Sequence, residues 1–415
     1  MNKNFKILKA DYILPITSPL IKKGFILIEN SKIKALGKQS EIPSDFTGQI
    51  FEFKSGVILP GFINLHSHID YTAVRTSDGN LNFFPWLRNL IETTKDWTYE
   101  DFLSSARKGA ELSLKAGITC IADTTPTMAS LIACKEKGLR GIIYQEVFGW
   151  DTDEKVILDE LEQKLQNAET GKNDILKIGI SPHAPYTVSS YIWKTVINYA
   201  TKYDYPLHCH LAETLDEKEW FLTGKGQIAG FRENWPPPRI SPVRFFAQNA
   251  LLVPQMICAH CVQVDEDDLK ILKDLQIIIG HCPRSNLLLK NGVMPLASVI
   301  KQNVSWGIGT DSHASCSTLD LFDEMRAVIK LHSDVKIKPF DLIKKVTYEH
   351  AGYLGLDSLI GSFEAGKKAD LIVVKLPDTR TYHDMSLLCE NLLKCSGKDV
   401  IFTMVNGNIT NQTLI

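Results

Sequence analysis

The sequence predicts an α/β fold: a (β/α)8 barrel of the TIM type, with a small β-sandwich built from both chain termini. Two observations lead to this prediction. Between about residues 57 and 350, apolar runs of strand length alternate with amphipathic segments of helical length. Towards both ends of the chain, only short strand-like runs separated by turn residues remain.

Eight apolar runs match the eight strands that such a barrel requires. In chain order they are 57–65, 117–122, 141–147, 176–180, 206–211, 255–261, 277–280 and 304–309. We therefore expect the barrel to span residues 59–355. The sandwich domain is expected to combine residues 1–58 with residues 356–415, where strand-like runs return.

The composition excludes several classes of partner. The 415 residues are 44% hydrophobic and 23% charged, with a formal net charge of −2, so no strong field attracts nucleic acid or a membrane surface. We read no signal peptide and no apolar run long enough to span a bilayer. The nine cysteines suit reduced thiols, so we expect a cytoplasmic protein with a small-molecule substrate, and a homodimer is left open.

Polar side chains follow nearly every predicted strand. Because the carboxyl ends of barrel strands form one mouth, these side chains are expected to converge although they are distant in sequence. The clusters are His66 with His68, 123–125, 145–146, 181–183, 208–213, His260, 281–286 and 310–313.

His66 and His68 form the first candidate metal pair. Their i, i+2 spacing places both side chains on one face of an extended strand. Such a pair is weak evidence alone, but His210 and Asp311 at other strand ends would complete a ligand set with one position open for water. We expect one divalent ion, with Zn²⁺ favoured and Fe²⁺ as the alternative, since histidine and aspartate accept both.

Three side chains are candidates for moving protons at this site. Glu213 lies three residues beyond His210, where its carboxyl group could carry protons between nucleophile and leaving group. His260 is expected to hydrogen-bond the attacking water. Asp311 could bind the ion and also accept a proton from that water, whose pKa a metal lowers to near 7.

Other histidines and cysteines have plainer interpretations. His208 shares the face of His210 one layer deeper, so we expect a buried, hydrogen-bonded histidine. His313 and His350 are expected to be solvated, and the role of His281 is left open. A thiolate site made by the cysteines of the strand ends is the less favoured alternative; these are Cys209, Cys258, Cys261 and Cys282.

Seven segments together resemble the amidohydrolase superfamily, in its branch of mononuclear-metal aminohydrolases that deaminate nucleobases and nucleosides. They cover nearly the whole chain in the family's order, and are 60–68, 181–186, 210–213, 259–261, 281–286, 309–312 and 361–371. The resemblance implies metal ligands, a proton-handling pair and one substrate contact. These are His66, His68, His210 and Asp311, then Glu213 with His260, and His183.

The resemblance further implies hydrolytic deamination of an aminated purine-type nucleoside. The segments 84–88 and 282–286 favour 6-amino-6-deoxyfutalosine, a substrate of menaquinone biosynthesis. Deamination of S-adenosylhomocysteine, methylthioadenosine or guanine, hydrolysis of a triazine or ring amide, and an inactive scaffold are the alternatives. Expected substrate contacts besides His183 are Arg284, Ser315, Glu146 and Trp86. The segment 94–96 lacks the ribose-binding glutamate of adenosylhomocysteine-type enzymes.

Overall fold

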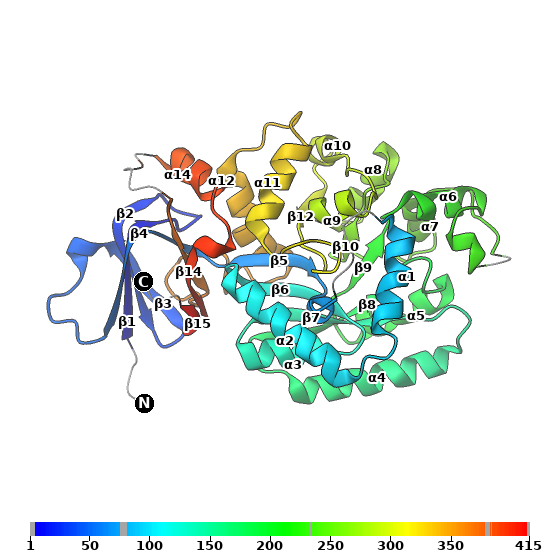
Figure 1. The fold of residues 1–415 in the computed structure, drawn as a ribbon, viewed down its shortest axis with the longest axis horizontal. Coiled ribbons are helices and arrows are strands. Elements are labelled where there is room, and N and C mark those ends of the chain that lie inside the picture. Colours follow the sequence, from blue (N-terminus) through cyan, green and yellow to red (C-terminus); the bar gives the residue numbers. More distant parts are fainter. Residues whose placement is uncertain (1–4, 75–80, 233–234, 378–381, 383, 413–415) are drawn as a thin grey trace.

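The computed structural model describes residues 5–412, except 75–80, 233–234, 378–381 and 383. The first and last strands of the chain lie together at one end of the molecule (Figure 1). They form one seven-stranded sheet in the order β15-β14-β13-β4-β1-β2-β3. Its strands are β1 (Phe5–Ile13), β2 (Ile21–Glu29), β3 (Lys32–Lys38), β4 (Gln49–Pro60), β13 (Leu371–Lys375), β14 (Val400–Val405) and β15 (Asn408–Gln412).

This sheet confirms that both termini share one β unit. Strand β4 joins the two ends, because it pairs in parallel with β1 and antiparallel with β13. The strands from both ends of the chain therefore form one continuous sheet. Buried apolar side chains such as Ile26, Ile58 and Phe402 make its core.

Parallel strands make up the larger part of the molecule and form two four-stranded sheets, β5-β6-β7-β8 and β12-β11-β10-β9. The first contains β5 (Phe62–Ser67), β6 (Ile118–Thr125), β7 (Arg140–Val147) and β8 (Leu176–Pro182). The second contains β9 (His208–Leu211), β10 (Ile257–His260), β11 (Ile278–His281) and β12 (Ser305–Ile308). Each of the eight predicted apolar runs overlaps one of these strands.

The edges of the two parallel sheets meet at both sides. An isolated bridge joins Ile180 to Leu207, and another joins Ser67 to Asp311. His350 links β5 to β12, since its Nδ1 donates to the Ile63 carbonyl at 2.6 Å and its Nε2 accepts from the Ile308 N–H at 3.0 Å. The expectation that His350 is solvated was wrong, because both ring nitrogens bond to strand backbone.

The first predicted run is divided between two sheets. Strand β4 ends at Pro60 in the terminal sheet, and β5 begins at Phe62. Gly61 allows this crossing, because a Cβ at this position would lie 2.0 Å from the Thr119 hydroxyl oxygen. The chain therefore passes directly from the terminal sheet to the first strand that carries the histidine pair.

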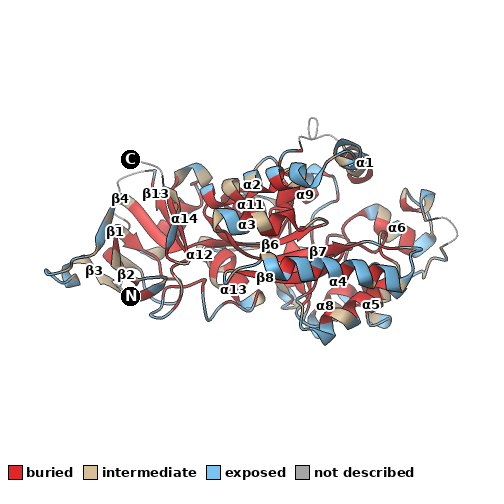
Figure 2. Cartoon of the chain, turned by 90° about the horizontal axis from the view of Figure 1, so that it is seen from below, coloured by how far each residue is buried: buried red, intermediate tan, exposed pale blue. Residues whose placement is uncertain are grey.

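Helices surround the parallel strands and turn their exposed faces outwards, as α4 shows in Figure 2. In α4 the buried residues Ile157, Leu161, Leu165 and Ala168 recur at helical spacing, which explains its amphipathic pattern. The α-helices are α1 (Phe83–Thr94), α2 (Tyr99–Lys115), α3 (Ala129–Lys137), α4 (Glu154–Gly171), α5 (Ser190–Lys202), α6 (Leu215–Thr223), α7 (Pro242–Gln248), α8 (Glu266–Asp274), α9 (Pro283–Leu288), α10 (Leu296–Lys301), α11 (Leu321–Leu331), α12 (Pro339–Lys344), α13 (His350–Tyr353) and α14 (Met385–Leu392).

A buried ion pair connects the terminal sheet to the parallel strands. The Arg140 guanidinium, at the start of β7, makes two bonds to the Asp370 carboxylate at 2.6 and 3.0 Å.

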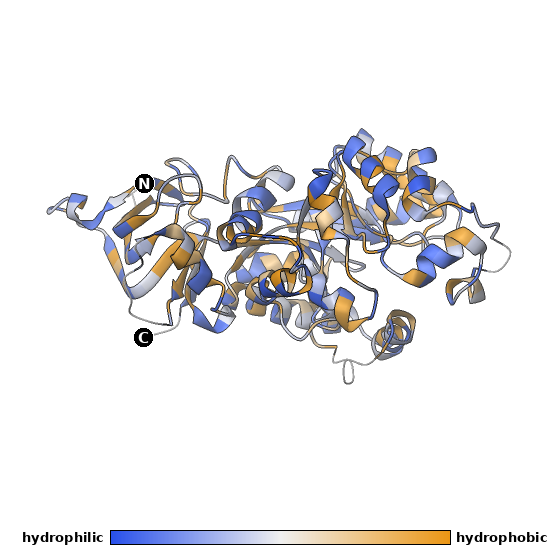
Figure 3. Cartoon of the chain, turned by 90° about the horizontal axis from the view of Figure 1, so that it is seen from above, coloured by the Kyte–Doolittle hydropathy of each residue, from blue (hydrophilic) through white to orange (hydrophobic). Residues whose placement is uncertain are grey.

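Hydrophilic residues gather on the outer faces of the helices (Figure 3). Among the described residues, no helix combines the length and apolar character needed to cross a bilayer.

Candidate active site

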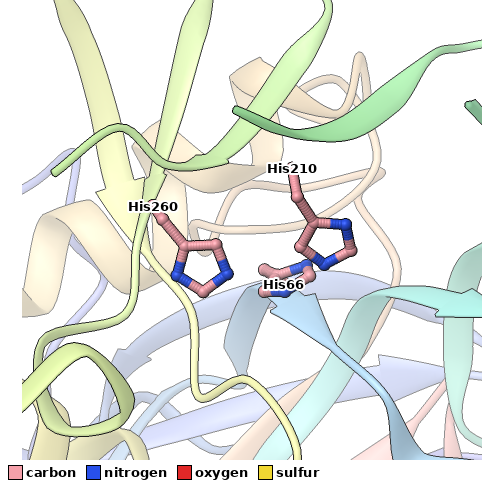
Figure 4. A group of neighbouring side chains, drawn as sticks. All are labelled: His66, His210 and His260. Atoms are coloured by element: carbon pink, nitrogen blue, oxygen red, sulfur yellow. The ribbon is translucent and has the colours of Figure 1, made fainter. Parts of the chain in front are cut away.

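Histidines and a carboxylate from separate strands converge at the carboxyl ends of the parallel sheets. His66, His210 and His260, at β5, β9 and β10, point towards one another (Figure 4). The Nε2 atoms of His68 and His210 lie 3.2 Å apart. Asp311 Oδ1 lies 3.6 Å from His66 Nε2 and 3.7 Å from His68 Nε2.

These distances fit a small divalent ion. A tetrahedral shell of ligand atoms about 2.1 Å from zinc places those atoms about 3.4 Å apart. His66 is fully buried, yet neither of its ring nitrogens has a hydrogen-bond partner among the described residues. An ion would satisfy His66 Nε2, the nitrogen that faces Asp311. Without a partner, this nitrogen stays desolvated at a free-energy cost.

The electrostatics of the cluster also suit metal binding. Burial lowers the pKa of His68 to about 3 and that of His210 well below its ordinary value, so both imidazoles are neutral and can donate a lone pair. Burial alone would raise the pKa of Asp311. The neighbouring imidazoles of His66, His260 and His68 instead lower this pKa below its usual range, so Asp311 is a carboxylate.

Overlapping groups of potential ligands occur in the described part of the chain. Their members are His66, His68 and Asp311; His66, His210 and His260; and His68, Glu146 and His210, with ligand atoms within 4.8 Å of one another in each group. The four expected ligands all belong to these groups. Cys258 and Cys261 have Cys-x-x-Cys spacing, but neither joins such a group among the described residues.

Neighbouring groups orient the expected ligands. His210 Nδ1 donates to the His183 carbonyl at 2.9 Å, which leaves Nε2 free to face the cluster. The Thr124 hydroxyl lies 2.9 Å from His68 Nδ1. Asp311 accepts bonds from the Ser285 and Ser315 hydroxyls and from the Ser312 N–H; these serines were not recognised from the sequence as orienting groups.

Glu213 is held beside the cluster by contacts from two other segments. Its Oε1 accepts a bond from Asn291 Nδ2 at 2.9 Å and lies 3.6 Å from His260 Nε2. Burial, followed by the charges of Asp311 and Glu217, raises the pKa of Glu213 well above its ordinary value. A carboxyl group with this environment favours its protonated form and can act as an acid.

Glu217 fixes the backbone that carries Glu213. Its buried carboxylate accepts the N–H of Ala212 at 2.8 Å and the N–H of Glu213 at 3.1 Å. Ala212 has a φ of +51°, a left-handed conformation that few non-glycine residues adopt without support. Sequence reasoning missed Glu217, although the Thr214-x-x-Glu217 spacing at the start of α6 was a usable signal.

His260 is oriented by Asn286, which the sequence did not indicate as a positioning residue. His260 Nδ1 donates to Asn286 Oδ1 at 2.8 Å, which leaves Nε2 as an acceptor towards the cluster. Burial lowers the pKa of His260 to about 4, so the ring is neutral. This imidazole can therefore accept a hydrogen bond from a water molecule at the cluster.

A cavity of about 280 Å³ lies over the cluster. Glu146, His183 and Trp86, three of the expected substrate contacts, line it. Trp86 is fixed by a bond from its Nε1 to the Ala314 carbonyl at 3.0 Å. Aromatic side chains from α1 and the loops after β7 and β8 contribute the walls; these are Phe83, Phe148 and Tyr186.

The other two expected substrate contacts are not among the residues that line this cavity in the described structure. Arg284 instead donates hydrogen bonds to Thr318 and Ser317 and forms an ion pair with Glu324, so its charge is paired within the protein. The Ser315 hydroxyl donates to Asp311. Both side chains have protein partners in the described structure, and their role as substrate contacts stays a prediction.

The remaining histidines divide as follows. His208 is fully buried and stacks on His66, with ring centroids 4.9 Å apart, but joins none of the potential ligand groups among the described residues. His281 and His332 are buried, and their Nε2 atoms lie 3.3 Å apart. His313 is half-buried and does not line the cavity over the cluster.

The fold and the site define the class of protein. The chain is an α/β protein with a buried cluster of histidines and carboxylates at the carboxyl ends of its parallel strands. The model of the amidohydrolase family matches residues 57–410, and the chain belongs to this family.

Proteins similar to this chain include one curated relative and two solved structures. A 5-methylthioadenosine/S-adenosylhomocysteine deaminase of Desulfitobacterium hafniense is 29% identical, over 98% of this chain and 93% of the relative. The structure of an adenosine deaminase from Xanthomonas campestris with bound zinc has a TM-score of 0.85 at 22% identity, covering 98% of this chain and 93% of that one. The structure of Helicobacter pylori aminofutalosine deaminase with methylthio-coformycin has a TM-score of 0.84 at 21% identity, covering 97% of this chain and 99% of that one.

Proposed function

We propose that this chain is a metal-dependent hydrolase that removes ammonia from an aminated purine-type nucleoside. The observation that carries the proposal is the surroundings of Glu213. This carboxyl group is buried and lines the cavity, has a raised pKa and lies beside the neutral imidazole of His260. Releasing an amine requires an acid that delivers a proton to it, and Glu213 meets this requirement.

His66, His68, His210 and Asp311 would hold the ion, with zinc favoured over iron(II) as the occupant. When bound, the ion would lower the pKa of a water molecule so that it can attack at neutral pH. The metal carried by the structurally similar adenosine deaminase is zinc, which agrees with this donor set. We propose the closed (β/α)8 barrel, with residues 59–355, as the scaffold, because both pairs of sheet edges meet.

The residues of the chain would then handle protons and charge. Glu213 would protonate a ring nitrogen of the substrate, which makes the amine-bearing carbon more electrophilic. His260 would accept a hydrogen bond through Nε2, since Asn286 occupies Nδ1, and would orient the attacking water. Asp311 and Glu213 would pass protons to the departing amine. His183 and Glu146 would contact the ring from the cavity wall.

Among nucleosides, 6-amino-6-deoxyfutalosine is our first candidate, which would place the enzyme in menaquinone biosynthesis. S-adenosylhomocysteine and methylthioadenosine are the nearest alternatives, because the curated relative is named for them. Thr94 lines the cavity where the sequence lacks the glutamate of adenosylhomocysteine-type enzymes. Guanine, triazines and ring amides remain as outcomes of the test.

The test is ammonia release from a panel of these compounds, measured with the wild type, Glu213→Gln and Glu219→Gln. Glu213→Gln should lower kcat by about 10³-fold with unchanged metal content, because the ligands are intact. Glu219, exposed on α6 shortly after Glu213, is the matched control and should retain full activity. Full turnover by Glu213→Gln, or turnover only of triazines or ring amides, would contradict the proposal.

A further inference from the structure

Two Asn-Gly pairs occur in the chain, Asn291-Gly292 and Asn406-Gly407. An asparagine amide is lost most readily in this dipeptide, because glycine has no side chain that hinders its own backbone nitrogen. That nitrogen attacks the side-chain carbonyl carbon of the asparagine, a cyclic imide forms and ammonia leaves. The dipeptide alone gives both pairs the same reactivity, so their surroundings in the fold decide which of them reacts.

The leaving group of Asn291 lies against the acid of the active site. Asn291 Nδ2 donates to Glu213 Oε1 at 2.9 Å, and Asn291 is only 2% exposed. In the proposed function, Glu213 delivers a proton to a departing amine. The amide nitrogen of Asn291 is a departing amine when the imide forms, and it is held at hydrogen-bond distance from the same carboxyl group.

The attacking nitrogen of Gly292 is also prepared for the reaction. Gln263 Nε2 donates to the Asn291 carbonyl, which belongs to the same peptide group as the Gly292 nitrogen. This bond stabilises the negative charge that reaches the carbonyl oxygen when the nitrogen loses its proton. Gly292 is exposed, and no described residue accepts a hydrogen bond from its N–H. Water can therefore remove that proton.

Asn406-Gly407, in the turn between β14 and β15, has different surroundings. The Gly407 N–H donates to the Ala369 carbonyl at 3.1 Å, so the attacking nitrogen is occupied. Asn406 Oδ1 has no hydrogen-bond partner among the described residues. Asn406 is half-buried, so exposure alone would make it react before the buried Asn291. The contacts predict the opposite order.

We propose that Asn291 is a self-modification site, at which the folded enzyme converts asparagine to aspartate or isoaspartate and thereby inactivates itself. The Gly292 nitrogen bonds to Cγ of Asn291 and gives its proton to water. The Cγ–Nδ2 bond breaks, and Nδ2 leaves as ammonia with a proton from Glu213. Glu213 recovers a proton from water, and a second water molecule opens the imide, so the net reaction consumes one water and releases one ammonia. The inference rests on the proposed function for the acid role of Glu213, and it is independent of the nucleoside.

The fold requires both residues of this labile pair. Asn291 bonds to Glu213, and Gly292 has a φ of +107°, where any L side chain is strained. Aspartate at position 291 would replace the donor beside Glu213 by a second carboxyl group. Two carboxyl groups at this distance disfavour each other's charge, and the orientation of Glu213 would be lost. Conversion at Asn291 therefore limits the working lifetime of the enzyme.

The experiment follows both sites in purified wild type during incubation at neutral pH. Mass spectrometry of proteolytic peptides detects each conversion as a mass gain of about 1 Da. In the folded protein Asn291 should convert at least about tenfold faster than Asn406, because only Asn291 has an acid beside its leaving group. In guanidinium chloride the two rates should be similar. Faster conversion of Asn406 in the folded protein, or the same tenfold difference in guanidinium chloride, would overturn the inference.

Two variants test the acid. Glu213→Gln keeps an acceptor oxygen for Asn291 but cannot donate the proton, so conversion at Asn291 should slow by at least about tenfold. Glu219→Gln is the control and should leave the rate unchanged. A variant that merely loosened this segment would convert faster, so a slower rate reports the lost proton. Unchanged or faster conversion in Glu213→Gln would contradict the proposal.

The loss of activity should follow the modification. In aged wild type, kcat should fall in proportion to the fraction converted at Asn291. Asn291→Asp, which reproduces one product, should have a kcat at least about tenfold below that of the wild type with unchanged metal content. Full activity of Asn291→Asp would overturn the inactivation. The mass measurement needs no substrate, so conversion at Asn291 without ammonia release from any nucleoside would mean that only the proposed function fails.

Discussion

Replacing Glu217 by Gln tests whether the backbone around Ala212 positions Glu213 for catalysis. The wild-type carboxylate accepts two adjacent N–H groups, and the amide of Gln can accept only one of them. The amide NH₂ would then face the second N–H, donor against donor. The left-handed conformation of Ala212 would lose one of the two hydrogen bonds that hold this backbone, and the side chain of Glu213 would move relative to His260.

The size of the effect follows from the bond that is lost. Burial raises the pKa of Glu217 to about 7, so the comparison is made at about pH 8, where this group is a carboxylate. A hydrogen bond to a charged group contributes about 1.5–3 kcal/mol, and an unsatisfied buried N–H costs about 1–3 kcal/mol. We therefore expect Glu217→Gln to lower the free energy of unfolding by about 2–4 kcal/mol. A displacement of about 1 Å in a reacting group costs about 10²-fold, so kcat should fall by about 10- to 100-fold while KM changes little.

The assay combines kcat and KM with metal content and urea unfolding, and Glu219→Gln is the control. A purely structural role would lower metal content and raise KM together with the loss of kcat. The double variant Glu213→Gln/Glu217→Gln gives a sharper criterion, since a residue that acts through Glu213 adds no further loss once Glu213 is replaced. If the double variant loses another tenfold or more, Glu217 acts independently and our reasoning is refuted.

Three further predictions concern metal, domain contact and pH. Chelation should lower the apparent Tm, by an amount corresponding to about 2.7 kcal/mol if the ion was present at about 100 times its Kd, and His66→Ala should abolish both metal binding and this response. Arg140→Met should lower the free energy of unfolding by about 3–5 kcal/mol in urea, because Asp370 is left buried and unpaired. Lys9→Met, at the surface pair with Glu52, should lower it by less than about 1 kcal/mol. Equal losses in the two variants would contradict this prediction. Burial lowers the pKa of His350 to about 3, so its imidazole stays neutral in the folded protein while it becomes protonated in the unfolded chain below about pH 6.5. Its contribution to the free energy of unfolding is therefore complete above about pH 6.5 and is lost as the pH falls towards 3. Between pH 7 and 5 the wild type should lose about 2 kcal/mol more than His350→Asn, and parallel losses would disprove this.

Local sequence patterns were sufficient for the elements and for the candidate ligands. The apolar runs located all eight parallel strands because a buried strand must be apolar whatever its partners are. His66, His68 and His210 were recognisable because they lie in or directly after such runs. The division of the first run at Gly61 was missed, since it depends on the approach of Thr119 from another strand.

Roles that depend on distant partners were not predictable in the same way. Arg284 has the chemistry of a substrate contact in sequence, but the fold places it against Ser317, Thr318 and Glu324. His350 has no local pattern that distinguishes it from a solvated histidine. Only the meeting of β5 with β12 creates the carbonyl and N–H that its two nitrogens bond.

The sequence by itself determined the order of strands and helices, the family and the residue types at the strand ends, because periodicity and motif spacing are properties of neighbouring residues. The tertiary structure alone decided which side chains orient Glu213 and His260, which face the cavity, and which are taken up by protein partners. The physical reason is that a hydrogen bond or a cavity wall requires groups from segments far apart in the chain, and packing of the whole molecule sets their positions to within a few tenths of an ångström.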